Sequence, residues 1–490
     1  MPVADSPVVL ACVVAYLISC FGIGIWAMRR TKTISDFLMA GQSLGPVVLV
    51  MAAMSSTMSG FGFIGGPGLV FESGMSSAYM TFAAMLGAPL IWVILGKRLR
   101  LVAEARDVLT LPDVVAARYG GRLPRFFMAL AILLGVLGYL GTQVMAIGLV
   151  SVAVLGVDLP VAMVIGLGVL AFYSVAGGIL AGVYTDLFQG ILMMGAAVIV
   201  FFVAIDKAGG LAAISTTLHQ MDPEFIGPWG TRGALTAMSW YLLFVLGQSG
   251  QPHVITKLMM IKNIRDLKWG GLMTGLAYSV LSLLWMGIGL SMRTLVQTGQ
   301  QEPLGSPDHA APVFLIEHCP ELLAGVVFAG LLAAIMSTAD SFLNIGAAAV
   351  VRDMPTAIIG RPLRRELMWT RIMTGVILLG SALFALYMEN LIALLGTFGW
   401  GTFAAAIVPS VAIGLNWKRA TASGCVASIV TSIVLNFSLE LMHKNGVYSL
   451  PDGFAVGAFS LLAALIVFVV VSLASPPQKI SSDIEAAMEV

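Results

Sequence analysis

Apolar runs of about 20 residues recur along the chain, and short polar segments separate them. A membrane-spanning helix needs about 20 apolar residues to cross a hydrocarbon core of about 30 Å. The pattern predicts an all-α membrane protein with about 13 transmembrane helices. They are expected near residues 7–28, 44–70, 76–96, 126–155, 160–178, 184–206, 234–256, 270–292, 322–351, 368–388, 391–415, 420–440 and 453–474.

Polar residues and glycines interrupt two of the expected spans. The span 44–70 carries hydroxyl side chains and then glycines between residues 55 and 68, and the span 234–256 carries Gly, Gln, Ser and Pro between residues 247 and 253. Such breaks are tolerated in a membrane where the freed backbone groups line a cavity. With the first span set aside, these are the first and sixth of ten core helices, a pattern that indicates an inverted-repeat transporter with a midplane site. Glycines that only serve helix packing are the alternative.

The ninth span carries the cluster Ser337-Thr338-Ala339-Asp340-Ser341. Ser337, Asp340 and Ser341 share one helix face, and the adjacent hydroxyls of Ser337 and Thr338 can both bind a small hard cation. The alternative is that these hydroxyls bond back to carbonyls of their own helix.

Two aspartates, Asp186 and Asp340, are placed inside predicted spans, and the other acidic residues fall in loops or at span ends. A carboxylate in the membrane costs at least about 2.5 kcal/mol, so each is a candidate functional residue. The alternative for Asp186 is a capping role at the end of its helix.

Composition supports a membrane protein and argues against other classes. Apolar residues make up 59% of the chain and charged residues 10%, against about 25% charged in soluble domains. The net charge of +1 gives no reason to expect a nucleic-acid partner. The four cysteines match no disulfide or metal pattern, and no cluster of His, Cys or carboxylates has catalytic spacing, so no enzyme activity is expected.

The basic residues predict the orientation of the chain. If the N-terminus lies outside the cell, the outside loops hold only Lys207, Arg232, Arg293 and Lys444, and the other 22 of the 26 basic residues lie inside. This bias is the one expected for cytoplasmic loops. We therefore expect an outside N-terminus and a cytoplasmic C-terminus, and no Lys or Arg is expected at the membrane midplane.

The chain resembles the sodium/solute symporter family, and most closely its sodium/proline and sodium/pantothenate symporter branch. The resemblance covers nearly the whole chain and rests on motifs at 36–45, 59–68, 109–113, 185–190, 250–253 and 333–338. It implies a LeuT-type 5+5 inverted-repeat core with broken first and sixth core helices.

The expected organisation follows from this resemblance and from the spans. An extra N-terminal helix and loop occupy residues 1–43, and the core occupies 44–415, with repeats at 44–206 and 234–415. Two peripheral helices follow at 416–474, and the polar residues 475–490 are expected to form a disordered cytoplasmic tail.

The same resemblance implies a set of site residues. Sodium would bind the carbonyls of Ser55, Met58 and Ala334 and the hydroxyls of Ser337 and Thr338. A second cation site would match Asp186, Ser337, Asp340 and Ser341, where Asp340 replaces a serine of the two-sodium relatives. The solute would contact Thr57, Ser59, Gly60, Gln143, Phe244, Gln248 and Trp400. Proline carriers have other residues at the positions of Thr57, Phe244 and Gln248, so proline itself is not supported as the solute.

These observations predict a secondary transporter in the cell (inner) membrane. It would import a small organic solute (an amino acid, a carboxylate or a vitamin-like molecule) by alternating access, with Na⁺ as the coupling ion. Its partners would be the solute and membrane lipid, and it would work as a monomer. Two alternatives stay open: a proton-coupled carrier that uses Asp186 or Asp340 as a relay, and a membrane sensor module.

Overall fold

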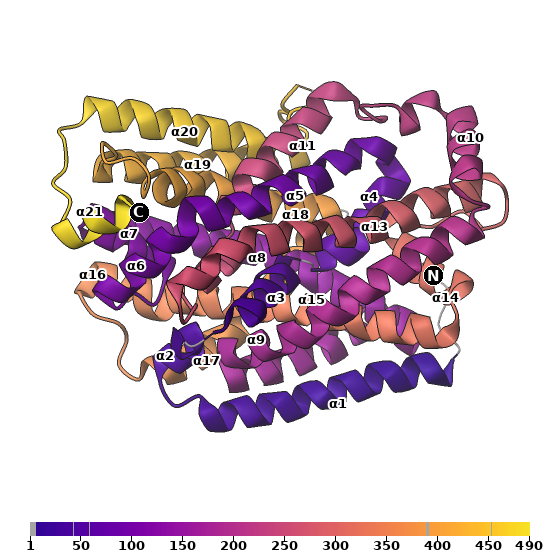
Figure 1. Cartoon of the computed structure of the whole chain (residues 1–490), viewed down its shortest axis with the longest axis horizontal. Helices are drawn as coiled ribbons and strands as arrows, with labels where there is room; N and C mark the ends of the chain where they lie inside the picture. Colours follow the sequence, from indigo (N-terminus) through magenta and orange to yellow (C-terminus); the bar gives the residue numbers. More distant parts are fainter. Residues whose placement is uncertain (1–5, 43, 58, 389–391, 452) are drawn as a thin grey trace.

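The computed structural model describes residues 6–490 except 43, 58, 389–391 and 452. Long helices run side by side along the long axis of the molecule (Figure 1). Ten helices of the described part are long and apolar enough to cross a membrane. The helices are α1 (Pro7–Arg30), α2 (Ile34–Met39), α3 (Pro46–Thr57), α4 (Gly66–Ser73), α5 (Ala78–Ile91), α6 (Lys97–Arg106), α7 (Leu111–Tyr119), α8 (Arg122–Leu155), α9 (Leu159–Lys207), α10 (Leu211–Met221), α11 (Gly233–Gly247), α12 (Pro252–Leu258), α13 (Gly270–Gln297), α14 (Ala310–His318), α15 (Glu321–Ala348), α16 (Met354–Ile359), α17 (Glu366–Met388), α18 (Ile392–Ile407), α19 (Ala422–Lys444), α20 (Val456–Ala474) and α21 (Ser482–Met488).

The count of about 13 spans is not confirmed: ten helices of the described part are long and apolar enough to cross a membrane, and Pro46–Ser56 and Leu159–Phe172 are shorter apolar helices. The spans expected at 160–178 and 184–206 are joined in the continuous helix α9, which has 49 residues. At 1.5 Å per residue a straight helix of this length would measure ~74 Å, more than twice a hydrocarbon core. The sequence offers one glycine, Gly182, but no proline between the two expected spans, so no residue there forces the helix to end.

Both predicted helix breaks are present. α3 ends at Thr57, and helical structure resumes in η2 (Phe61–Gly65) and α4. On the other side, α11 ends at Gly247 and continues as one turn of 3₁₀-helix, η6 (Gln248–Gly250). Gln251 is then extended (φ −82°, ψ 108°), and α12 begins at Pro252, where the missing N–H costs nothing because the first N–H groups of a helix have no intrahelical partner. Glycine and proline therefore end the first and sixth core helices where the sequence indicated.

The half-helices α3 and α12 are tied together by backbone hydrogen bonds. The N–H of Leu44 donates to the carbonyl of Met260 at 3.1 Å, and the N–H of Lys262 donates to the carbonyl of Leu44 at 2.9 Å. The segment that enters α3 is thus held beside the segment that leaves α12. This pairing places the segment before α3 next to the segment after α12, although the two come from different halves of the chain.

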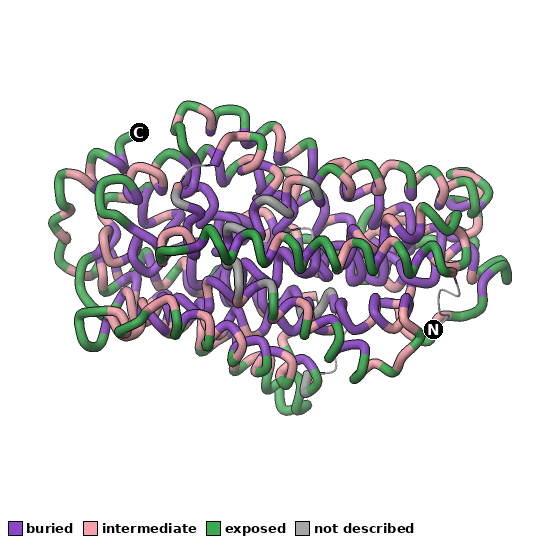
Figure 2. Tube along the Cα trace, turned by 90° about the horizontal axis from the view of Figure 1, so that it is seen from below, coloured by how far each residue is buried: buried purple, intermediate pink, exposed green. Residues whose placement is uncertain are grey.

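Burial separates the inner helices from the lipid-facing ones. Along the window of α15 that could span a membrane, 78% of the residues are buried, whereas for α1 the value is 22%. α1 crosses the front of the view in Figure 2 and is largely exposed. Most of its exposed side chains are apolar, among them Val14, Ile18 and Phe21, as expected of a surface in contact with lipid.

The C-terminal residues are ordered, so the expected disordered tail is wrong for at least residues 482–488. They form α21, which packs against α6 with Ile484 fully buried. Asp483 pairs with Arg106 at the end of α6, and Lys418 binds Glu485 at 2.8 Å and Glu489 at 2.6 Å. The acidic side chains of the tail pair with Arg106 of α6 and with Lys418, which lies between α18 and α19, and composition alone does not show these contacts.

A buried carboxyl group lies at the end of the molecule that holds α10 and α14. This end is opposite the one formed by α6, α7, α16 and α21 (Figure 1). Asp308 lies in η8 (Pro307–His309), and its carboxylate accepts the N–H of Ile392, the first residue of α18, at 2.9 Å. Burial, with a smaller contribution from Glu72, raises the pKa of Asp308 from 3.8 to about 6, although the hydrogen bond from Ile392 opposes the shift. The folded protein therefore holds Asp308 as the neutral acid up to about pH 6, well above the range of a free aspartate.

We expect this group to make folding stability depend on pH. Because its folded pKa lies above the unfolded value, its stabilising contribution is complete below about pH 4 and is lost as the pH rises through about 6. The thermal unfolding midpoint of the purified protein should therefore rise between pH 7.5 and pH 5. Asp308→Asn should remove part of that rise, and an identical pH dependence in the variant would contradict the assignment.

Candidate functional site

The predicted sodium ligands lie where α15 meets the end of α3. The Thr338 hydroxyl is within hydrogen-bond distance of two carbonyl oxygens, that of Ser56 at 2.9 Å and that of Ala334 at 3.0 Å. The Ser337 hydroxyl donates to Asp186 of α9. Because α3 ends at Thr57, the carbonyls of its last turn have no intrahelical partner, and the helix dipole makes this end partly negative. Hydroxyl, carbonyl and carboxylate oxygens thus converge there, and oxygen ligands suit a small hard cation.

Two of the expected ligands from the first broken helix are less fully described. Ser55 is buried, and its hydroxyl lies 3.5 Å from Oε1 of Gln189 on α9. Met58 lies outside the described residues. The sodium site of the sequence analysis therefore stays a prediction for which α3 and α15 supply the expected neighbours.

A lysine that the sequence analysis placed in an inside loop belongs to this cluster. Lys257 of α12 is 1% exposed, and its ammonium group donates to the carbonyl of Ala52 at 2.9 Å, to the hydroxyl of Ser56 and to the carboxylate of Asp186 at 2.9 Å. The sequence analysis expected this lysine in an inside loop, whereas the structure buries it between α3, α9 and α12. The helix after the break carries Lys257 back against α3, and the apolar residues on both sides of it in the sequence were the available signal.

The other members of the predicted second cation site are arranged differently. Asp340 is fully buried near Ser174 of α9 and Asn344 of its own helix, and both of its carboxylate oxygens are without a hydrogen-bond partner among the described residues. A methyl group at Gly182 would come within 2.8 Å of Oδ2 of Asp340, so the missing side chain lets the two helices approach. Ser341 is buried beside it. Among the contacts of the described residues, Asp186 is joined to Ser337 and Lys257, while Asp340 belongs to a neighbouring polar group.

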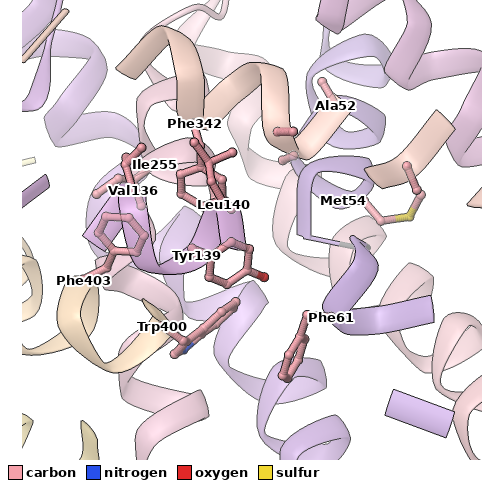
Figure 3. Packing of buried hydrophobic residues seen from close by; sticks show 14 of the residues in the cluster. Ala52, Met54, Phe61, Val136, Tyr139, Leu140, Ile255, Phe342, Trp400 and Phe403 are labelled. Atoms are coloured by element: carbon pink, nitrogen blue, oxygen red, sulfur yellow. The ribbon is translucent and has the colours of Figure 1, made fainter. Parts of the chain in front are cut away.

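The predicted solute residues surround the two breaks. Gln143 of α8 accepts the N–H of Gly60 at 3.0 Å, and the hydroxyls of Ser59 and Tyr139 lie 3.3 Å apart. In Figure 3 the rings of Tyr139 and Trp400 lie beside Phe61, which follows the first break. The side chain of Thr57 lies outside the described part of the structure.

The second break contributes an aromatic wall and an amide. Phe244 of α11 stacks on Trp400 of α18 with ring centroids 4.9 Å apart. Gln248 donates from Nε2 to the hydroxyl of Tyr278 on α13 at 3.0 Å. These contacts bring residues from α11, η6, α13 and α18 to one place next to the first broken helix.

A small cavity of about 30 Å³ lies among these residues. Phe61 lines this cavity and contacts two other rings. The centroid of its ring lies 5.7 Å from that of Phe244, in a stacked arrangement, and 5.5 Å from that of Trp285, edge on. The cavity includes two predicted solute residues, Phe244 and Trp400, and several that the sequence analysis missed. It is lined by Phe61, Gly62, Met80, Thr81, Ala84, Phe244, Tyr278, Ser282, Trp285 and Trp400.

Three polar atoms of the predicted solute residues are buried without a hydrogen-bond partner in the described part of the chain. They are Nε2 of Gln143, Oε1 of Gln248 and Nε1 of Trp400. An unsatisfied buried polar atom costs about 1–3 kcal/mol, and native proteins keep few of them without a reason. Two N–H donors and one acceptor are thus left for a polar partner, and of these three residues Trp400 lines the cavity.

Comparison with known proteins identifies the family of this chain. The model of the family "Sodium:solute symporter family" matches residues 37–432. The chain belongs to this family. Membership confirms the predicted class of function, sodium-coupled transport of a solute with Na⁺ as the coupling ion, and a transporter in place of an enzyme.

Relatives in the sodium:solute symporter family are similar along almost their whole length. The chain is 28% identical to the osmoregulated proline transporter OpuE of Bacillus subtilis, covering 92% of each chain. It is 27% identical to the sodium/pantothenate symporter of Escherichia coli, covering 93% of this chain and 94% of the relative. These matches confirm the predicted branch of the family.

A solved structure shows the fold independently. The chain resembles the substrate-bound, outward-open state of a Na⁺-coupled sialic acid symporter with a TM-score of 0.79 and 21% identity, covering 97% of this chain and all of that one. This likeness confirms the LeuT-type fold of a multi-pass membrane transporter.

Proposed function

We propose that the chain imports a small organic solute together with Na⁺ by alternating access, using a cation site between α3 and α15. The observation that carries this proposal is the position of the Thr338 hydroxyl, which bonds at 2.9 Å to a carbonyl of the last turn of α3. A cation bound there would draw the broken first core helix and α15 together. Its binding would therefore favour the conformation in which the solute site is complete.

The proposed ligands are those that the sequence analysis named. Hydroxyls of Ser337 and Thr338 and the carbonyl of Ala334 come from α15, and the carbonyls of Ser55 and Met58 come from α3. The buried position of α15 and the partly negative end of α3 support this assignment. Dehydrated Na⁺ needs several oxygen ligands from the protein, and both helices offer them.

For the solute, we propose a small neutral or zwitterionic molecule with an apolar part. The cavity walls are mostly aromatic, and no Lys or Arg is among the described residues that line the cavity. The three donor groups of Lys257 already bind protein oxygens. A carboxylate on the solute would therefore bind to amide and indole N–H groups, of which Gln143 and Trp400 offer one each, and the apolar part would pack against Phe61 and Phe244.

Relatives transport proline and pantothenate, and both molecules combine a carboxylate with an apolar part. We do not assign proline itself, because the residues at Thr57, Phe244 and Gln248 differ from those implied for proline carriers. An uptake screen with amino acids, short carboxylates, vitamins and sugars is the direct way to identify the solute.

We propose that the carrier lies in the cell (inner) membrane as a monomer, with the N-terminus outside and the C-terminus in the cytoplasm. The distribution of Lys and Arg supports this orientation. The α6–α21 end would then be cytoplasmic, and Asp308 would face the outside. The core would comprise residues 44–415 with repeats 44–206 and 234–415, and α19 and α20 would be peripheral.

The free energy released by one Na⁺ ion is sufficient to accumulate the solute. One Na⁺ moving down a potential of 100 mV releases about 2.3 kcal/mol, and a tenfold concentration gradient adds about 1.4 kcal/mol. The sum of about 3.7 kcal/mol corresponds to several-hundred-fold accumulation of a neutral solute. One ion per cycle is therefore an adequate driving force.

The test is uptake of radiolabelled candidate solutes into proteoliposomes that contain the purified protein. We expect uptake of at least one solute to require an inward Na⁺ gradient and to increase with an inside-negative potential. Uptake that is independent of the Na⁺ gradient and depends only on a pH gradient would refute sodium coupling and favour the proton-coupled alternative.

A further inference from the structure

The ammonium group of Lys257 is bound the way a small cation would be bound. An ammonium group has three donors and no acceptor, and here the three acceptors are the Ala52 carbonyl, the Ser56 hydroxyl and the Asp186 carboxylate. Carbonyl, hydroxyl and carboxylate oxygens are also the ligands that Na⁺ and other hard cations take. The ion pair is buried: the side chain of Lys257 is 1% exposed and that of Asp186 is 0% exposed.

This arrangement directly adjoins the proposed sodium site. The second oxygen of Asp186 accepts the hydroxyl of Ser337, and the backbone carbonyl of Ser56, whose own hydroxyl binds Lys257, bonds to Thr338. Ser337 and Asp186 are also two of the four residues of the predicted second cation site. The lysine therefore reaches the position at which a second sodium ion would neutralise Asp186.

We propose that Lys257 is a tethered cation that replaces a second sodium ion at Asp186 and limits the carrier to one Na⁺ per solute. This inference rests on the proposed sodium-coupled function and specifies its stoichiometry. With Lys257 in place, Asp186 is already neutralised, so a further cation at Asp186 would add an unbalanced charge to a buried site. Without the lysine, the buried carboxylate would need another cation.

The arrangement also explains why the two membrane aspartates differ. Asp340 has no hydrogen-bond partner among the described residues, whereas Asp186 is the carboxylate that binds both Lys257 and Ser337. The predicted second cation site has two carboxylates, those of Asp186 and Asp340. The ammonium group of Lys257 takes the place of the cation and binds Asp186.

The experiment measures how many sodium ions accompany each solute in proteoliposomes, by comparing ²²Na⁺ uptake with solute uptake and by the Hill coefficient for Na⁺. We expect a ratio and a Hill coefficient of about one for the unmodified protein. Lys257→Gln, which removes the charge but keeps an N–H donor, should raise both towards two. The double variant Asp186→Asn/Lys257→Gln should return both to about one, because it has no carboxylate to neutralise.

Lys262→Gln is the matched control. Lys262 lies five positions further on and its side chain is exposed, so the same substitution there should leave the ratio at one. Size-exclusion profiles establish that each variant is folded. If Lys257→Gln is folded but does not transport, Na⁺-dependent thermal stabilisation reports its cation sites directly, and we then expect a second binding phase that the double variant lacks.

Two results would overturn the inference while leaving sodium coupling intact. One is an unmodified carrier that already moves two Na⁺ per solute. The other is a folded Lys257→Gln variant that still takes up or binds a single sodium ion. Failure of the proposed function would look different, because the unmodified protein would then show no Na⁺-dependent uptake at all.

Discussion

Replacement of both Ser337 and Thr338 by alanine is expected to raise the Na⁺ concentration for half-maximal transport at least tenfold. The change removes two hydroxyl oxygens from the proposed ligand set, and a tenfold loss corresponds to about 1.4 kcal/mol of binding free energy. It also removes the bond between Thr338 and the carbonyl of Ser56 that joins α15 to α3. Initial uptake rates at a series of Na⁺ concentrations would measure the effect.

A control must separate ion binding from the loss of two buried hydroxyls. Thr370 and Thr374 of α17 are also buried, and their hydroxyls bond to carbonyls of their own helix at 2.8 and 2.9 Å. The Thr370→Ala/Thr374→Ala variant should keep its Na⁺ requirement. An equal increase in both double variants would show that general destabilisation, and not ligand loss, is responsible.

Gln248→Ala is expected to weaken solute binding about tenfold or more, with a smaller change in the Na⁺ requirement. The amide stands at the second helix break with Oε1 unpaired among the described residues, and its Nε2 is fixed by Tyr278. Loss of a buried hydrogen-bonding group that contacts the solute costs about 1–3 kcal/mol. Competition binding at saturating Na⁺ would give the solute affinity.

Tyr278→Phe is the companion variant, because it removes the hydroxyl that fixes the amide and keeps the ring. We expect it to weaken solute binding less than Gln248→Ala, since Oε1 of Gln248 would remain available. If Gln248→Ala instead reduced the solute and Na⁺ affinities equally, the residue would be a support for the helix break and not a part of the solute site.

The parts of the fold that the sequence predicted are those with a strong local cause. Clusters of glycine, proline and polar residues inside an apolar segment favour a helix break, so the breaks near Met58 and Gln251 could be found without a structure. The cluster at Ser337 and Thr338 was visible because two adjacent hydroxyls and an aspartate lie within five consecutive residues of an apolar span. Both features depend on a few neighbouring residues.

The missed features depend on contacts between distant segments. Lys257 was assigned to a loop because a charge close to the end of an apolar run usually marks the membrane surface, and its partner Asp186 lies 71 residues earlier. Phe61 and Trp285 could not be distinguished from packing residues, since aromatic side chains occur throughout membrane helices. The docking of α21 depends on Arg106 and Lys418, which no local pattern connects to the tail.

The buried pair of Lys257 and Asp186 also has a consequence for biogenesis. An unpaired lysine in the hydrocarbon core costs up to about 2.5–3.5 kcal/mol, so pairing with Asp186 makes it easier to bury α12 in the protein. Translation delivers the carboxylate first, because Asp186 precedes Lys257 by 71 residues in the chain. The helix that accepts the positive charge is thus already synthesised when the lysine leaves the ribosome.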